Sequence, residues 1–169
     1  MSDLSFMITT DTCCDLPKSY IKDNGLDVVT LYYNMKGVAY GKEIELEVKE
    51  FYDMMRGGEM PTTMAANPDE LRDMFEKYLK EGKDILHLAF SSELSSSYNN
   101  AAVVARELNE QYTGNKVIVI DTLSASLGQG LVVHKAVQLR KEGKTIDETA
   151  AWVEENKLHF CHQFTVDDL

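Results

Sequence analysis

The sequence predicts an α/β domain in which a mainly parallel β-sheet is covered by helices on both faces. Three observations support this prediction. Short apolar runs alternate with longer segments of helical periodicity, most of these runs end in polar turn residues, and the segments between them can carry the crossover helices that parallel strands require. With 169 residues, the chain suits one domain with a hydrophobic core and is short for two.

The predicted strands are short runs rich in β-branched or aromatic residues and bounded by turn-forming residues. They cover residues 5–10, 26–33, 38–41, 85–90, 117–120 and 158–166. The run at 117–120 is the most apolar, and residues 34–37 form the predicted turn before a short edge strand. In the last run, Phe160, Phe164 and Val166 alternate with polar residues, as in a half-buried strand.

The predicted helices carry apolar residues at i, i+3, i+4 spacing between start and stop signals. The clearest helix runs from Asn67 to Gly82, with an apolar stripe that comprises Leu71, Met74, Phe75, Tyr78 and Leu79. The others are residues 18–24 after Pro17, 47–56 before Gly57, a helix from Tyr98 to about Gly114, one ending at Gly143, and one from Thr145 through Val153 with Glu148 in a capping box.

A serine-rich turn joins the strand at residues 85–90 to the next helix, and five of the seven residues 91–97 are serine. The first turn of a helix presents unpaired N–H groups and a positive dipole end, which favour a carboxylate or phosphate. The alternative is that one of Ser91, Ser92, Ser95 or Ser96 simply caps the helix. One cap needs a single hydroxyl, so five serines favour an anion site.

Hydroxyl-bearing loops also follow other predicted strands, at residues 9–12 and 121–122, and a further polar loop covers 60–66. In parallel sheets, ligands lie in the crevice beyond the carboxyl ends of the strands. The topology therefore predicts one shared crevice that includes Asp11, Thr12 and Asp121.

Asp11 and Asp121 allow two interpretations. Each could act as an acid or base, which would require a perturbed pKa, or each could accept backbone N–H bonds in a turn. The second is favoured because no paired base or nucleophile is apparent. The motifs GxSxG, GxxxxGK[ST], GxGxxG and HExxH do not occur. His159 and His162 would point to opposite faces of a strand, so no metal site is expected.

Composition narrows the possible partners and the location. The formal net charge of -11 would repel a phosphate backbone, so nucleic acid is not expected as a partner. No apolar run reaches the roughly 18 residues of a membrane span, and the N-terminus lacks the features of a signal peptide. We therefore expect a cytoplasmic protein that is not integral to a membrane. Its three cysteines, Cys13, Cys14 and Cys161, are expected to be reduced and buried.

Four motifs in this order resemble the DegV family, and together they cover nearly the whole chain. They are Thr10-Asp11-Thr12 before Asp15-Leu16-Pro17, Thr62-Thr63 before Asn67-Pro68, Ser91 to Tyr98, and Ile120-Asp121-Thr122 before Leu127-Gly128-Gln129-Gly130. The resemblance implies an N-terminal α/β domain of the type shared by DegV proteins, dihydroxyacetone kinase and mannose-type phosphotransferase components. Met64, Ala65 and Ser96 depart from the family pattern of these motifs.

The resemblance also implies a function and a site. It implies a bound long-chain fatty acid, without a cofactor, whose carboxylate is held by Thr63 and Ser95. Thr62, Ser92 and Ser96 are the neighbours of these two residues. Some relatives are carrier subunits that present the acid to a separate fatty acid kinase, and on this basis the protein itself catalyses no transfer.

DegV proteins continue into a second domain, so the resemblance implies a lipid-binding domain at residues 1–157 and the start of a truncated second domain at 158–169. The chain would then be a fragment of a longer protein or a natural truncation. Two other functions stay open on the residues alone. One is a small enzyme or phosphotransfer component acting on a phosphorylated or hydroxylated metabolite with Asp11 or Asp121 as base, and the other is a protein-interaction domain without a ligand.

Overall fold

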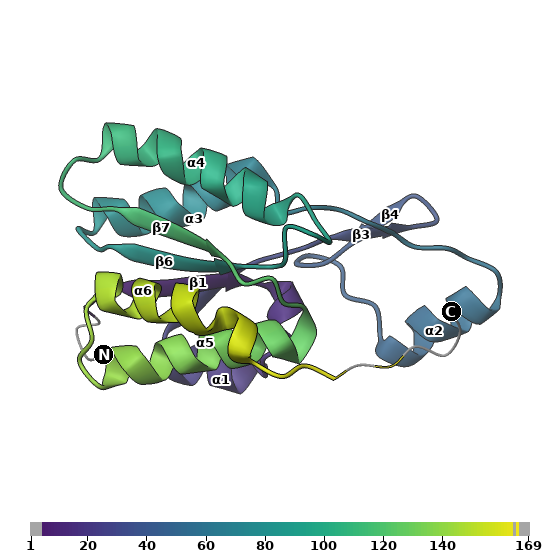
Figure 1. The fold of residues 1–169 in the computed structure, drawn as a ribbon. Helices are drawn as coiled ribbons and strands as arrows, with labels where there is room; N and C mark the ends of the chain where they lie inside the picture. Colours follow the sequence, from purple (N-terminus) through teal and green to yellow (C-terminus); the bar gives the residue numbers. More distant parts are fainter. Residues whose placement is uncertain (1–4, 164, 166–169) are drawn as a thin grey trace.

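The computed structural model describes residues 5–163 and 165, and it has the predicted α/β architecture (Figure 1). Four parallel strands form the main sheet in the order β2-β1-β6-β7. They are β1 (Met7–Asp11), β2 (Leu26–Val29), β6 (Ile85–Ala89) and β7 (Val117–Asp121). One face of the sheet is covered by α3 (Pro68–Lys80) and α4 (Ser97–Gln111), and the other by α1 (Lys18–Asp23), α5 (Ser126–Lys141) and α6 (Ile146–Asn156).

Each face of the sheet has its own hydrophobic core. Successive residues of a strand point to opposite faces, so Met7 belongs to the core under α3 and α4, whereas Ile8 belongs to the core under α5 and α6. The predicted helical stripe of α3 is buried from Leu71 to Leu79. Among the described residues, no helix is both long and apolar enough to cross a membrane.

The predicted helix start signals are present in the structure. The side chain of Asn67 accepts a hydrogen bond from the N–H of Asp69 at 2.9 Å at the start of α3. Thr145 and Glu148 form the complete capping box of α6, in which each side chain accepts from the other residue's N–H.

The prediction of one strand at residues 26–33 is wrong, because the segment divides between two sheets. β2 ends at Val29, and Tyr33 begins β3 (Tyr33–Met35), which pairs antiparallel with β4 (Val38–Tyr40) and β5 (Thr62–Thr63). The break is caused by the turn that follows the neighbouring strand β1. The chain after β1 turns into the 3₁₀ helix η1 (Thr12–Cys14), so the N–H of Leu31 donates to the Thr12 hydroxyl at 2.9 Å instead of to a strand.

Residues 33–61 form an arm that projects from the main sheet (Figure 1). Its hairpin turns through Lys36 and Gly37, which both have positive φ (55° and 77°), as a two-residue turn of this type requires. The hairpin is followed by α2 (Val48–Arg56), which buries no residue. The ring of Phe51 on α2 contacts the ring of Tyr33, with 5.3 Å between centroids.

The prediction of a final strand at residues 158–166 is also wrong for the part that the structure describes. Residues Lys157–His159 form a 3₁₀ helix, and 160–163 and 165 lie outside helices and strands, while Phe164 and Val166 are outside the described residues. Phe160 packs against Trp152 of α6, with ring centroids 6.3 Å apart, so its apolar side chain is covered by a helix. Cys161 is exposed, contrary to prediction, whereas Cys14 is buried and Cys13 is partly buried.

His159 and His162 consequently lie outside any strand, so the strand geometry from which we expected no metal pair is absent. The described residues contain no group of three or more His, Cys, Asp or Glu side chains placed to hold a metal ion.

A buried carboxylate joins three segments at the carboxyl edge of the main sheet. Asp11 accepts hydrogen bonds from the N–H of Phe90 (2.8 Å), the N–H of Cys13 (3.0 Å) and the side-chain amide of Gln129 (3.1 Å). Burial raises the pKa of Asp11, and the three donors act in the opposite direction. The prediction that Asp11 accepts backbone N–H bonds is therefore confirmed. The Asp121 carboxylate likewise accepts hydrogen bonds from the N–H groups of Ser92 and Leu123, both at 3.1 Å.

Gly130 allows α5 to lie against η1 beside this carboxylate. A Cβ atom at Gly130 would lie 2.6 Å from the carbonyl oxygen of Cys14, which is closer than packing allows. Any side chain at this position would push α5 away from η1 and separate Gln129 from Asp11.

We expect Asp11→Ala to lower the free energy of unfolding by roughly 2–4 kcal/mol, because three donors around a buried carboxylate lose their acceptor. The matched control is Asp121→Ala, which removes a partly exposed carboxylate with two N–H partners and should cost about 1 kcal/mol. Urea unfolding measures both values. Equal losses for the two variants would contradict the role assigned to Asp11.

His87 makes stability depend on pH. Its ring is buried between Thr9, whose Oγ1 lies 3.0 Å from His87 Nδ1, and Phe75, and burial lowers the pKa of His87 to about 3. As pH falls below about 6.5, the unfolded chain binds a proton that the folded protein does not bind. The folded protein therefore loses stability from this group as pH falls, down to about pH 3.

We expect His87→Gln to reduce the slope of the unfolding free energy against pH, on the acid side, by up to about 1.4 kcal/mol per pH unit relative to the unaltered protein. His134→Gln, the same imidazole-to-amide change at a partly buried position on α5, is the matched control. Chemical unfolding at several values between pH 4 and pH 7 measures the slopes. Identical profiles for all three proteins would contradict the effect assigned to His87.

Candidate functional site

A cavity of about 780 Å³ lies at the carboxyl edge of the main sheet. Segments that follow three of the parallel strands form one side of it, and segments at the base of the arm form the other. The lining comprises residues 12, 13, 15, 31–33, 63–65, 90, 94–96, 125 and 126. The cavity thus lies where ligands of parallel sheets are found.

Four of the eight predicted site residues line this cavity: Thr12, Thr63, Ser95 and Ser96. They come from the turn after β1, from β5, and from the loop between β6 and α4, so the fold brings together hydroxyls that are far apart in the sequence. Ser126, at the start of α5, adds a hydroxyl that the sequence analysis did not select.

The other four predicted residues do not line this cavity. The Asp11 carboxylate is enclosed by its three donors, and the Asp121 carboxylate accepts the N–H bonds of Ser92 and Leu123. Ser92 thus contributes its backbone N–H to the loop, and Thr62 is exposed opposite Asn34 in the arm sheet. These residues hold neighbouring segments in place.

Two hydrogen bonds at Ala66 bring the Thr63 segment to the start of α4. The N–H of Ala66 donates to the Ser97 hydroxyl at 3.1 Å, and the Asn100 side-chain amide donates to the Ala66 carbonyl at 2.9 Å. The N–H of Met64 donates to the Tyr32 carbonyl at 2.9 Å and joins the same segment to the base of the arm. Thr63 and the serine turn therefore belong to one connected wall.

The hydroxyl of Ser95 can donate into the cavity. Its oxygen accepts the N–H of Ser97 at 3.2 Å and lies 2.9 Å from the Ser97 hydroxyl. Either hydroxyl can be the donor in this pair, and when Ser97 donates, the Ser95 proton is left for another acceptor. Ser96 occupies the N-cap position without a side-chain capping bond.

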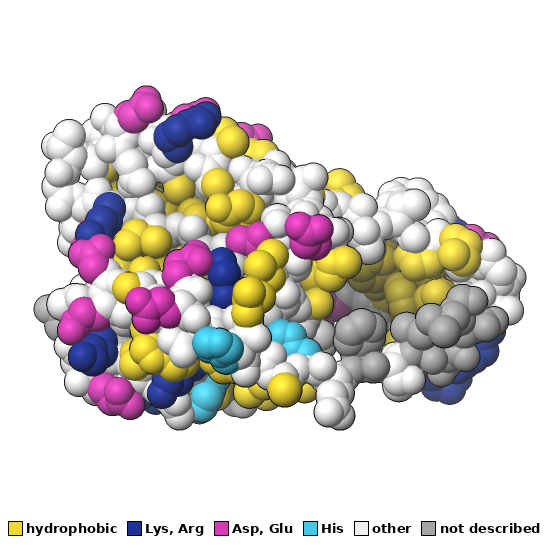
Figure 2. Space-filling model, viewed as in Figure 1, with side chains coloured by type: hydrophobic (Ala, Val, Ile, Leu, Met, Phe, Trp, Pro, Cys, Tyr) yellow, Lys and Arg dark blue, Asp and Glu magenta, His cyan; other side chains and the backbone are white. Residues whose placement is uncertain are grey.

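The cavity also has an apolar side, which the sequence analysis missed. Leu31, Tyr33, Phe90 and Leu94 line it, and hydrophobic side chains are visible in the hollow between the main body and the arm (Figure 2). Two of these residues lie in the segment that was predicted as one continuous strand. The predicted turn at residues 34–37 follows both of them, so it does not mark the break between β2 and β3.

Two residues of the cavity wall have left-handed backbone conformations, and a hydrogen bond joins their side chains. Asp15 (φ 52°) and Ser126 (φ 53°) line the cavity, and the Ser126 hydroxyl donates to the Asp15 carboxylate. Leu123, in the neighbouring loop, is also left-handed (φ 49°). Such backbone conformations are unfavourable for residues with a side chain and cluster at functional sites.

The thiol of Cys13 is held in its neutral form beside these residues. Burial, followed by the nearby Asp11 and Asp15 carboxylates, raises the pKa of Cys13 to about 12. At neutral pH the residue therefore presents a thiol and no reactive thiolate. The cavity wall accordingly combines the Asp15 carboxylate, neutral hydrogen-bonding groups and apolar side chains.

Comparison with known proteins places this fold and cavity in a family. A family model described as "Uncharacterised protein, DegV family" matches residues 5–169. A DegV domain-containing protein of Clostridium perfringens is 45% identical over 166 residues, which is 97% of this chain and 57% of the relative. The chain spans about half the length of the curated relatives it matches.

Two solved structures are similar to the fold described above. One, described as showing fatty acid binding of a DegV family protein from Thermus thermophilus, has a TM-score of 0.82 at 30% identity and covers 91% of this chain and 54% of that one. The other is DegV from Bacillus subtilis, described as a fatty acid binding protein, with a TM-score of 0.80 at 25% identity over 92% of this chain and 55% of that one. With the family model matching nearly all of its residues, the chain belongs to the DegV family.

Proposed function

We propose that this chain binds a long-chain fatty acid, with the carboxylate against the hydroxyls of Thr63 and Ser95 and with Thr12 and Ser96 beside them. The observation that carries the proposal is the convergence of these hydroxyls from three segments in one cavity with an apolar side. A fatty acid requires this combination, because its head group needs a few donors and its chain needs an apolar surface.

The surroundings of Ser95 favour a negatively charged head group. The residue lies beside the first turn of α4, whose 15 residues direct a positive dipole end toward the loop. The Ser95 oxygen accepts the N–H of Ser97, and when the Ser97 hydroxyl donates to it as well, the Ser95 proton is available for a carboxylate oxygen. Hydrogen bonds to a charged group are stronger than those between neutral groups.

The relatives support the same class of ligand. The structures from Thermus thermophilus and Bacillus subtilis are both described as fatty acid binding. We further propose that the protein acts as a carrier and presents the bound acid to a separate fatty acid kinase, so that it catalyses no transfer itself. A carboxylate at the carboxyl edge of the sheet, beside exposed Thr63, would be within reach of such a partner.

The first test is direct identification of the ligand. We expect organic extraction of the purified chain, followed by mass spectrometry, to yield long-chain fatty acids in a fixed ratio to protein. A chain stripped of lipid should take up oleate or palmitate again in a calorimetric titration. A chain that carries no fatty acid and takes up none would overturn the proposal.

The second test concerns the head group. Thr63→Ala and Ser95→Ala should each weaken fatty acid binding by roughly 1–3 kcal/mol, because each removes a hydrogen bond to a charged group. Thr62→Ala and Ser92→Ala are matched controls, since these neighbours do not line the cavity and should bind as the unaltered chain does. Unchanged affinity in both Thr63→Ala and Ser95→Ala would place the carboxylate elsewhere.

A further inference from the structure

A single carboxylate, that of Asp15, lies in the wall of the cavity at the carboxyl edge of the main sheet, which we call the first cavity. The described residues that line this cavity include no lysine, arginine or histidine and no second acidic residue. The hydroxyls of Thr63 and Ser95, where we place the carboxylate of a ligand, are neutral. A bound anion therefore meets one charged side chain in this wall, and its charge is negative.

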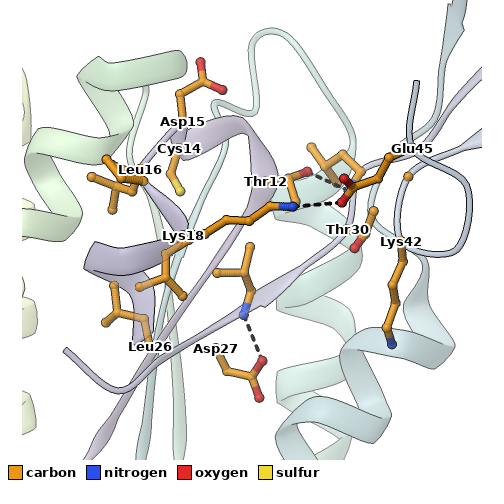
Figure 3. Close-up of a pocket in the computed structure, with 15 residues that line it drawn as sticks. Thr12, Cys14, Asp15, Leu16, Lys18, Leu26, Asp27, Thr30, Lys42 and Glu45 are labelled. Atoms are coloured by element: carbon orange, nitrogen blue, oxygen red, sulfur yellow. Dashed lines mark hydrogen bonds and ion pairs between the residues drawn. The ribbon is translucent and has the colours of Figure 1, made fainter. Parts of the chain in front are cut away.

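The Asp15 carboxylate is held on the side of the first cavity. The N–H of Asp15 donates to the Thr12 carbonyl at 3.4 Å, and the carboxylate accepts a hydrogen bond from the Ser126 hydroxyl. Asp15 also lines a second cavity, of about 770 Å³, but there its carboxylate points away from the ion pair of Lys18 with Glu45 (Figure 3). Ser126 lines the first cavity and not the second, so its bond keeps the carboxylate beside the first.

No cation neutralises Asp15 within the described part of the chain. Asp15 forms no ion pair there, and Lys18, three residues further along, is paired with Glu45 at 2.9 Å. The charge of Asp15 acts on the neighbouring Cys13, because it contributes, after burial and Asp11, to raising the pKa of that thiol to about 12. A negative charge on a ligand in the same cavity would be repelled by the same carboxylate.

We infer that Asp15 determines how much negative charge the first cavity accepts, so that the cavity binds amphiphiles with one negative charge and discriminates against those with two. This inference rests on the proposed function and extends it to the class of head group. The hydroxyls and the first turn of α4 favour a single carboxylate, whereas Asp15 opposes each further charge. Phosphate monoesters and dicarboxylic acids are thus the disfavoured classes.

Ligands that differ in head-group charge provide the test. At pH 8, decanol, decanoate and decyl phosphate carry about zero, one and two negative charges on similar apolar chains. Asp15→Asn removes one repulsion for each charge of the ligand. It should leave decanol binding unchanged, strengthen decanoate binding about two- to fivefold at low salt, and strengthen decyl phosphate binding by the square of that factor, as measured by titration calorimetry.

Asparagine suits this test because it tolerates the left-handed conformation of Asp15 and its amide oxygen can still accept from Ser126. Asp23→Asn is the matched control, since it removes the same charge from an exposed position at the end of α1 that lines neither cavity. It should change none of the three affinities by more than about twofold. Added salt should reduce the effect of Asp15→Asn, because salt screens the repulsion.

Two results would overturn the inference. One is an equal change for all three ligands in Asp15→Asn, which would indicate an effect on packing, and the other is no change for decanoate and decyl phosphate. The proposed function would survive either result as long as the unaltered chain binds decanoate. Absence of fatty acid binding by the unaltered chain would instead contradict the function, and the inference with it.

Discussion

The carboxylate of Asp11 is the constraint on which the candidate site depends. It lies at the end of β1 and accepts bonds from the loop after β6, from the turn after β1 and from α5, so three walls of the first cavity are fixed relative to one buried group. Burial disfavours the ionised form of Asp11 and raises its pKa, whereas the three hydrogen-bond donors stabilise the ionised form. Gly130 makes the arrangement possible because it lets α5 approach η1.

The many hydroxyls near this edge divide into two groups. Thr10, Ser91, Ser97, Thr122 and Ser124 are buried and bond to neighbouring protein groups. Thr12, Thr63, Ser95 and Ser96 line the first cavity. Buried hydroxyls need a partner within the protein, so a hydroxyl-rich turn of this kind serves both to hold the loops together and to leave donors for a ligand. Composition alone does not separate the two groups.

Sequence patterns predicted helices and helix caps correctly where the structure of a segment depends only on neighbouring residues. The periodicity of α3, its Asn67 cap and the capping box of α6 are all properties of neighbouring residues. The break after Val29 depends instead on where β1 ends and on a hydrogen bond between Leu31 and Thr12, which are 19 residues apart.

The candidate site also depends on contacts between segments that are distant in the sequence. Serine spacing indicated an anion-binding turn, but only the assembled fold separates Ser95, in the cavity wall, from Ser92, which supports Asp121.

The arm forms part of the cavity wall, so the free energy of holding the arm in position contributes to the affinity for a ligand. Leu31, Tyr32 and Tyr33 at its base line the cavity at the carboxyl edge of the main sheet, yet α2 buries no residue against the body. For a ligand that needs the arm in place, the apparent dissociation constant is the intrinsic one divided by the fraction of molecules with the arm in that position. Substitution of Phe51, which contacts Tyr33 but does not line the cavity, would thus change affinity without altering a residue of the cavity wall.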